Sequence, residues 1–388
     1  MFRSIGTVLL ALVGACASTV LASAQATSSQ TEVNIPTQTS SAPVAYVYVS
    51  SSPTSSTSQI NAYAAASTGA LTKVSGSPFS TKMTYMALTG HWLFGTNGID
   101  IDSFSIASNG ALKQADSYTA GNTSGGPGDL FLDHTGASLY DGYYNLEGTG
   151  NNGYQAYSVN HTTGKISYIN DVVGGPSIGP PLSFVSSNQF AYSSTCYHFT
   201  PSIFGLQRHA DGSITELTSN PPFPTTAAAG FYCPYLAAAD PASHLAVAMQ
   251  PLTSDWGVAG PYQLATYTAD SSGNLTTHST ASNMPKVAVG NVMDYQMSPS
   301  GKFLAVGGSA GLQVFHFNGA NPVTKYTGLL TSNEVDQMFW DNANHLYAIS
   351  RTAGKLYVFT VTSTGVTQAP GSPHSIANPN DMIVLPKS

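Results

Sequence analysis

The sequence predicts an all-β protein made of repeated antiparallel sheets, and three observations support this fold class. A phrase with a glycine turn and a short strand recurs along the chain, as GALTKVSGSPF (69–79), GALKQADSY (110–118), GSITELTSNPPF (212–223) and GVTQAPGSPH (365–374). Strands with alternating apolar and polar residues precede these phrases, which is typical of strands with two different faces. No segment of useful length shows the 3.6-residue period of an amphipathic helix.

Each repeat is expected to contain four strands in a fixed order. A first strand and a small turn lead into a second strand, as in DLFLDHTGASLYDGYY (129–144) and DYQMSPSGKFLAVGG (294–308). After a loop, a third strand alternates with period two, as in INAYAA (60–65) and LYVFTV (356–361). A tight turn with Gly, which tolerates positive φ, then joins the third strand to the fourth.

The repeats number seven, which predicts a seven-bladed β-propeller of four-stranded antiparallel blades. Their second strands lie near Tyr46, Leu93, Leu139, Phe190, Leu245, Leu304 and Leu346. The first repeat begins directly with a second strand, AYVYVSS (45–51), and NDMIVLP (380–386) supplies its missing first strand. We therefore expect the C-terminal strand to complete the first blade and close the ring, which removes an exposed sheet edge.

The N-terminal region is predicted to direct export. Residues 1–26 contain one Arg, an apolar run too short for a membrane span, and small residues that end in Ala-Gln-Ala, as in a signal peptide cleaved before Thr27. Alternatively, Val-Gly-Ala-Cys at 13–16 resembles a lipoprotein box that would leave a lipid anchor on Cys16. Residues 27–43 are Ser/Thr-rich and are expected to be a disordered linker before a propeller at 44–388. The predicted location is secreted or periplasmic.

Two further cysteines, Cys196 and Cys233, remain in the predicted propeller. Both fall near one face, in the fourth and fifth repeats, and an oxidising compartment favours a disulfide between them. Two buried free thiols are the alternative.

The phrases YVYVSS, INAYAAASTGALTKVSGSPF and SPSGKFLAV resemble the lactonase-type seven-bladed propellers, a family that includes 6-phosphogluconolactonase and a muconate cycloisomerase of similar fold. The resemblance covers residues 44–388. It implies hydrolysis of a lactone by Arg, His and Glu side chains near the mouth of the central channel. One family landmark resembles Gly-Pro-Arg-His before a late first strand, but the matching stretch here, 286–301, contains neither Arg nor His. That departure favours a binding role over lactone hydrolysis.

Several residues fall in loops on the face where propellers usually bind ligands. Glu147, His198 and Arg351 are the catalytic candidates that the resemblance implies. Tyr and Trp offer a flat apolar face with a polar edge, which suits sugar rings and partner surfaces. The aromatic candidates for ligand binding are Tyr143, Tyr144, Tyr197, Trp256 and Tyr262. Solvated loop residues and loops packed on themselves are the simpler interpretations of these side chains.

A carboxylate recurs at the start of first strands, which line the channel of a propeller. The positions are Asp129, Asp294, Asp336 and Asp381. Four carboxylates around one axis predict a bound Ca²⁺, which prefers oxygen ligands. The alternative is that each Asp accepts hydrogen bonds from backbone N–H groups at its own turn. No other cofactor is predicted.

Composition narrows the function further. Charged residues make up 8% of the chain, and its 12 Lys+Arg are scattered through a sequence of net charge −7. This excludes a basic patch for nucleic acid. We expect an exported monomer without a transmembrane segment that presents its loop face to a glycan, a peptide or an envelope partner. The alternatives are hydrolysis of a sugar lactone or other small cyclic ester, and a structural surface-repeat protein.

Overall fold

The computed structural model describes residues 42–120, 127–144, 152–175, 181–185, 187–197, 200–217, 221–226 and 229–387. The predicted signal peptide, Cys16 and nearly all of the predicted linker lie outside these residues. The described residues form strands and turns without a helix, so none of them forms a helix long and apolar enough to cross a bilayer.

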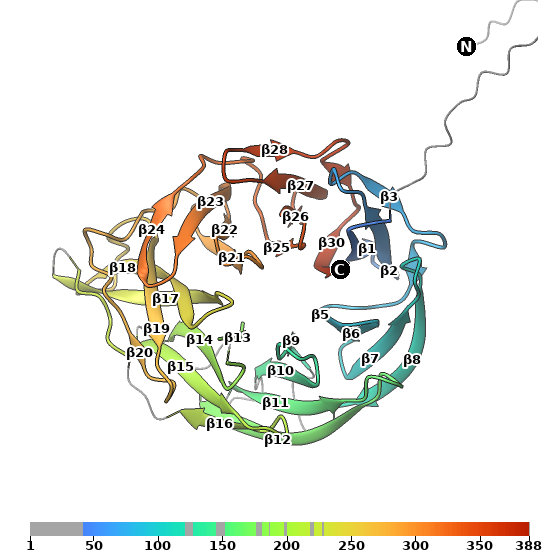
Figure 1. Cartoon of the computed structure of the whole chain (residues 1–388), viewed down its shortest axis with the longest axis horizontal. Helices are drawn as coiled ribbons and strands as arrows, with labels where there is room; N and C mark the ends of the chain where they lie inside the picture. The colour runs from blue at the N-terminus through green and yellow to red at the C-terminus, as the bar shows by residue number, and fades with distance from the viewer. Residues whose placement is uncertain are drawn as a thin grey trace, which may run out of the picture. The chain divides into compact units, whose positions relative to one another are not determined.

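Seven antiparallel sheets follow one another around a ring (Figure 1). The first sheet contains β3 (Leu71–Lys73), β2 (Thr57–Ala65), β1 (Ala45–Thr54) and β30 (Pro379–Pro386), with β4 (Phe79–Ser80) also paired to β2. The second contains β5 (Met86–Thr89), β6 (Trp92–Thr96), β7 (Asp100–Ile106) and β8 (Leu112–Thr119). The third contains β9 (Asp129–Leu132), β10 (Ser138–Tyr144), β11 (Asn152–Val159) and β12 (Ile166–Gly175).

The remaining four sheets repeat this order. The fourth contains β13 (Ser183–Phe184), β14 (Phe190–Tyr197), β15 (Thr200–Arg208) and β16 (Ile214–Leu217). The fifth contains β17 (Gly230–Ala239), β18 (His244–Thr253), β19 (Gln263–Ala269) and β20 (Leu275–Thr276). The sixth contains β21 (Val292–Met297), β22 (Phe303–Gly308), β23 (Gly311–Asn318) and β24 (Asn321–Lys325). The seventh contains β25 (Gln337–Trp340), β26 (His345–Ser350), β27 (Lys355–Val361) and β28 (Val366–Gln368), with β29 (His374–Ser375) also paired to β27.

The predicted seven-bladed propeller is therefore confirmed, and so is its closure. Strand β30 pairs antiparallel with β1, from Ala45 opposite Pro386 to Ser50 opposite Asp381. Segments more than 300 residues apart in sequence thus complete one blade, and β30 lies at the centre of the ring beside β1 (Figure 1). The hydrogen-bonded register fixes the side-chain direction of β30, because a one-residue slip would turn every side chain to the other face.

The recurring glycine turn joins neighbouring blades as well as neighbouring strands. Gly110, in the outer turn of the second blade, has a φ of 85°, and a methyl group there would overlap the ring of Tyr46 in the first blade. The hydroxyl of Tyr48 donates a hydrogen bond to the carbonyl of Gly110 at 2.9 Å. The hydroxyls of Tyr140 and Tyr192 make the same kind of bond, to the turn glycines of the fourth and fifth blades. The glycine turns of the repeated phrase therefore contact the neighbouring blade, in addition to forming the turn.

The hydrophobic core lies between adjacent sheets. One cluster combines Tyr48 and Ile60 of the first blade with Leu93 and Phe104 of the second, all buried. Each such side chain contributes about 1.5–3 kcal/mol when it leaves water. Six further clusters fill the other interfaces between blades in the same way.

Some segments expected to be loops are strands in the structure. Strand β10 runs to Tyr144, β14 runs to Tyr197 and β17 begins at Gly230, so the hairpins of the third to fifth blades extend further than the sequence suggested. Hydrogen bonding between long neighbouring strands satisfies these backbone groups without an irregular loop.

Candidate functional site

The innermost strand of each sheet faces the centre of the ring (Figure 1). These strands are β30, β5, β9, β13, β17, β21 and β25. Residues on or beside all seven line one cavity of about 480 Å³. Small-molecule sites in proteins typically have volumes of about 300–1,000 Å³. The cavity is therefore the candidate functional site.

One end of this cavity has a ring of polar side chains, which we call the channel mouth. Three aspartates of the predicted set, Asp129, Asp294 and Asp381, occupy equivalent positions on three inner strands, and Gln337 occupies that position on β25. Their opposite residues on the second strands are Gly142, Gly307, Ser50 and Ile349. Asp336 lies one residue earlier, where the alternation of strand side chains gives it a different direction from Gln337.

Two side chains of the mouth connect neighbouring inner strands. The carboxylate of Asp294 accepts a hydrogen bond from the backbone N–H of the adjacent Tyr295 at 2.7 Å. It accepts another from the backbone N–H of Met338 on β25. The side-chain oxygen of Gln337 accepts a hydrogen bond from the backbone N–H of Met382 on β30 at 2.7 Å. The sixth, seventh and first blades are thus joined in series at the mouth.

Arg351 lies at the same end, in the turn between β26 and β27. The carboxylate of Asp336 accepts a hydrogen bond from the backbone N–H of Arg351 at 2.7 Å. The Nε of Arg351 donates to the carbonyl of Asn380 at 2.9 Å, so the side chain crosses from the seventh blade to the first. Arg351 is exposed and lines the cavity, where its charge lowers the pKa of nearby carboxyls.

Burial nevertheless dominates the titration of these carboxyls. Desolvation raises the pKa of Asp129 to about 6 and that of Asp294 to about 6, although Arg351 opposes both shifts. Desolvation raises the pKa of Asp381 to about 7, and the charge of Asp129 adds to the rise. One carboxylate oxygen of Asp381, Oδ2, is buried and has no hydrogen-bond partner among the described residues. A buried acceptor of this kind costs free energy until a donor reaches it.

Gln337 and Tyr85 of the mouth, and Asp141 behind the cavity wall, were not predicted from the sequence. The phenol of Tyr85 lines the mouth on β5's side, and its pKa is raised first by burial and then by the charge of Asp129. Asp141 on β10 is fully buried behind Asp129, accepts a hydrogen bond from the N–H of Gly128 at 2.7 Å, and has its pKa raised by burial to about 7. Alignment of the inner strands by their register would have identified Tyr85. It comes directly before Met86 of β5, just as Asp381 comes directly before Met382 of β30.

Of the three predicted catalytic residues, the structure brings Arg351 to the mouth, whereas Glu147 and His198 lie outside the described residues. The calcium prediction gains no ligand cluster: within the described residues, no three His, Cys, Asp or Glu side chains are close enough to hold a metal ion. Asp294 accepts a hydrogen bond from the backbone N–H of its neighbour Tyr295, as the alternative interpretation expected, whereas Asp336 accepts one from Arg351 in a different turn.

The predicted aromatic residues differ in their exposure to solvent. Tyr143 and Tyr262 are buried, and Tyr262 packs in the core between the fifth and sixth blades, so neither ring is open to a ligand. Tyr144 and Tyr197 lie on β10 and β14, and their side chains fall outside the described part of the structure. Trp256 is 45% exposed and packs edge-to-face on Phe231 at 4.8 Å between ring centroids.

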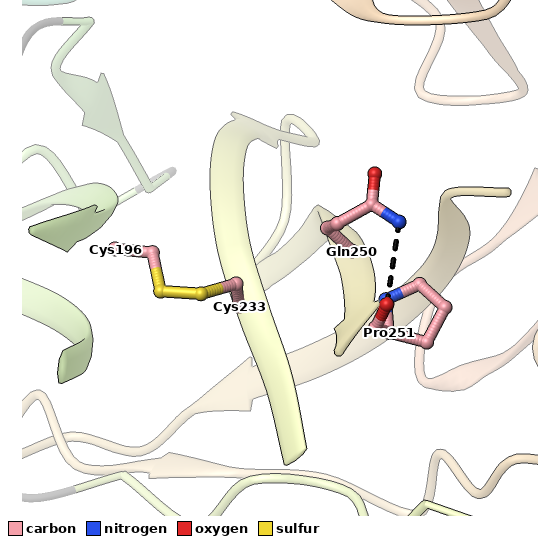
Figure 2. The surroundings of a disulfide bond; sticks show 4 residues. All are labelled: Cys196, Cys233, Gln250 and Pro251. Carbon is pink, nitrogen blue, oxygen red and sulfur yellow. Dashed lines mark hydrogen bonds between the residues drawn. A yellow bond between two sulfur atoms is a disulfide. The ribbon is translucent and has the colours of Figure 1, made fainter. Parts of the chain in front are cut away.

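Cys196 on β14 and Cys233 on β17 form a disulfide, with their Cα atoms 5.3 Å apart (Figure 2). The bond joins the fourth and fifth blades. Cys233 lies opposite Gln250 in the sheet, and Gln250 donates a side-chain hydrogen bond to the carbonyl of Pro251 at 3.4 Å (Figure 2). Gln250 also donates to the carbonyl of Gly260 at 2.6 Å, which fixes the turn beyond β18.

Comparison with known proteins identifies similar folds only among solved structures. No family model matches the chain, and no curated protein matches it. A putative 6-phosphogluconolactonase from Bacteroides fragilis has a TM-score of 0.65 at 12% identity, over 89% of this chain and 99% of that chain. The periplasmic gluconolactonase PpgL from Pseudomonas aeruginosa has a TM-score of 0.65 at 13% identity, over 88% of this chain and 99% of that chain. The chain thus has the fold of lactonase-like propellers.

Proposed function

We propose that the protein binds a small neutral sugar or related polyol at the channel mouth. The observation that carries this proposal is the convergence of three carboxyls, the amide of Gln337, the phenol of Tyr85 and the guanidinium of Arg351 on one cavity of about 480 Å³. Carboxylates and amides accept hydrogen bonds from hydroxyl groups, and Arg donates to hydroxyl and carbonyl oxygens. A sugar hydroxyl would also satisfy the buried Oδ2 of Asp381.

The charge of the mouth argues against a phosphorylated ligand. Arg351 is the only cation among the described residues that line the cavity, and four Asp residues line it too. A phosphate would bring about two negative charges at pH 7 into this acidic opening, where like charges repel. Although one similar structure is titled a putative 6-phosphogluconolactonase, the ligand proposed for this chain lacks the phosphate.

Isothermal titration calorimetry with a matched set of ligands tests this proposal. The set comprises glucose, glucono-δ-lactone, gluconate and glucose 6-phosphate. We expect the neutral ligands to bind and glucose 6-phosphate to bind at least about ten-fold more weakly, because of the charge of the mouth. Tighter binding of the phosphorylated sugar, or no binding of either neutral ligand at millimolar concentration, would contradict the proposal.

Hydrolysis of a sugar lactone in the same cavity is a second candidate function, and a specific observation favours it. The pKa values of Asp129 and Asp381, raised to about 6 and about 7, suit a general base and a general acid at neutral pH. Arg351 would polarise the lactone carbonyl. Acid release from glucono-δ-lactone, measured in a pH-stat above the uncatalysed rate, tests this function. Turnover that persists in both Asp129→Asn and Arg351→Gln would contradict it.

We also propose that the protein works in an oxidising compartment, secreted or periplasmic. The disulfide between Cys196 and Cys233 supports this location, because disulfides persist mainly outside the reducing cytoplasm. Mass spectrometry of the mature protein tests both the disulfide and the N-terminus. A chain that starts at Thr27 supports signal-peptide cleavage, a lipidated Cys16 supports an anchor, and a reduced cytoplasmic chain contradicts export.

A further inference from the structure

We propose that the sugar bound at the mouth carries an apolar alkyl or aryl group that enters the channel beneath it. This inference rests on the proposed function and narrows its ligand from a free sugar to an amphipathic glycoside. It follows from the second tier of side chains in the channel and from an apolar gap in the polar ring.

The second tier is found two residues further along each inner strand, where side chains point to the same side as those of the mouth. Beneath Asp129, Gln337 and Asp381 are Phe131, Phe339 and Ile383. All three of these side chains line the cavity, and both Phe residues are only partly buried. Beneath Asp294 is Gln296, whose amide donates a hydrogen bond to the Asp294 carboxylate at 3.2 Å. Under Asp129, Gln337 and Asp381 the second tier is an apolar wall.

The ring of the mouth is also apolar on one side. At the position that Asp or Gln occupies in other blades, the fourth and fifth blades have Pro181 and Leu236. Two residues further along are Ser183 and Ala238, which are small and leave room beside the wall. An apolar group could therefore pass from the rim to the second tier along these two blades, without displacing the polar contacts on the other side.

A free sugar would not use this surface. The side chains of Phe131, Phe339 and Ile383 offer its hydroxyls no hydrogen bonds, and both Phe rings would stay partly in contact with water. An alkyl group placed there gains affinity by about four-fold for each methylene that leaves water. The order of the two tiers, polar above apolar, matches a ligand with a sugar head and an apolar tail.

The test is a titration of the full chain with n-alkyl β-D-glucosides from methyl to hexyl, below their micelle concentrations. We expect affinity to rise by roughly two- to four-fold per methylene, as apolar transfer requires. Phe339→Ala should flatten this rise, and Ser183→Phe should abolish it by filling the channel. The readout is the ratio of hexyl to methyl glucoside affinity within each variant, which should fall toward one in both. Val258→Ser, at a residue that is 73% exposed and outside the cavity, is the matched control.

The outcomes separate the two proposals. Equal affinity for methyl and hexyl glucoside would overturn the apolar tail and leave sugar binding intact. Absence of binding for the whole series would overturn both. Binding of hexan-1-ol as tight as that of hexyl glucoside would show an apolar site without a sugar head, and would also overturn both. Thermal unfolding of each variant shows whether it is folded. Because Phe339→Ala removes a side chain and Ser183→Phe fills the channel, either variant can decide the question if the other misfolds.

Discussion

The carboxylate of Asp336 accepts a hydrogen bond from the backbone N–H of Arg351 at 2.7 Å, and so holds the turn that brings a guanidinium over the channel mouth. The side chain of Arg351 is held in turn by the carbonyl of Asn380 in the first blade. Asp336 therefore acts through Arg351 as a positioning residue.

Replacement of Asp336 should weaken ligand binding more than folding. In Asp336→Ala the turn loses its acceptor, and we expect glucono-δ-lactone to bind roughly three- to ten-fold more weakly, with a loss of about 1 kcal/mol in the free energy of unfolding. Calorimetry and urea unfolding measure the two effects. Asp255→Asn, in an exposed turn of the fifth blade, is the control. Unchanged affinity in Asp336→Ala would show that Arg351 needs no such support.

Stability should fall as pH rises from about 4 to 7 and level off above pH 7. The folded state raises the pKa of Asp381 to about 7, so it binds this proton where the unfolded chain, with an ordinary pKa near 3.8, has already lost it. Stabilisation by the protonated form is complete below the unfolded pKa and is lost as pH passes through the folded pKa, by up to about 1.4 kcal/mol per pH unit for one group. Asp129 and Asp294 act in the same direction. Urea unfolding at several pH values measures the slope, and Asp381→Asn, which resembles the protonated acid, should reduce it. A slope of opposite sign would contradict the assigned burial.

Two turn glycines should respond very differently to the same substitution. Gly110→Ala should cost about 2–4 kcal/mol, because the new methyl group overlaps the Tyr46 ring and the residue has a φ of 85°. Gly365→Ala should be nearly neutral, since nothing lies within 4 Å of its added Cβ. Thermal unfolding compares the two variants. Equal effects would show that neither the positive φ of Gly110 nor its contact with Tyr46 contributes to stability.

Trp256 is expected to contribute only to longer glycans. Its φ of 72° is unusual for a residue other than Gly, and the turn that holds it is closed by hydrogen bonds between Thr253 and Gly257. The exposed ring belongs to the loop face of the fifth blade but does not line the cavity. On a glycan array, Trp256→Ala should lose oligosaccharide binding while glucose affinity, measured by calorimetry, is unchanged. Loss of glucose affinity would instead place Trp256 in the primary site.

Blade number and ring closure could be predicted from the sequence because they depend on local patterns that recur. The period-two strands and glycine turns recur from blade to blade, and AYVYVSS and NDMIVLP supply the second and first strands of one blade. The fine structure of the mouth could not be predicted in the same way. Asp336 and Gln337 are adjacent, and only the register of β25 decides that Gln337 takes the position of Asp294.

The sequence pattern also could not predict which aromatic side chains are exposed. Tyr143 and Tyr262 appeared to lie in loops, but β10 includes Tyr143 and the blade interface covers Tyr262. Their burial depends on residues distant in sequence. Trp256 lies in a tight turn whose hydrogen bonds are local, and its ring stays 45% exposed although one side packs against Phe231.

The most direct test of the central claim is the affinity of the full chain for glucono-δ-lactone in Asp381→Asn and Arg351→Gln, measured by calorimetry beside the wild type and Asp255→Asn. At pH 8, where Asp381 with its pKa of about 7 is mostly ionised, both mouth variants should lose about ten-fold or more in affinity while remaining folded if the polar ring binds the sugar, since hydrogen bonds to charged groups contribute about 1.5–3 kcal/mol. The Asp255→Asn control should match the wild type. Wild-type affinity in both mouth variants would show that the ligand binds elsewhere and would contradict the account.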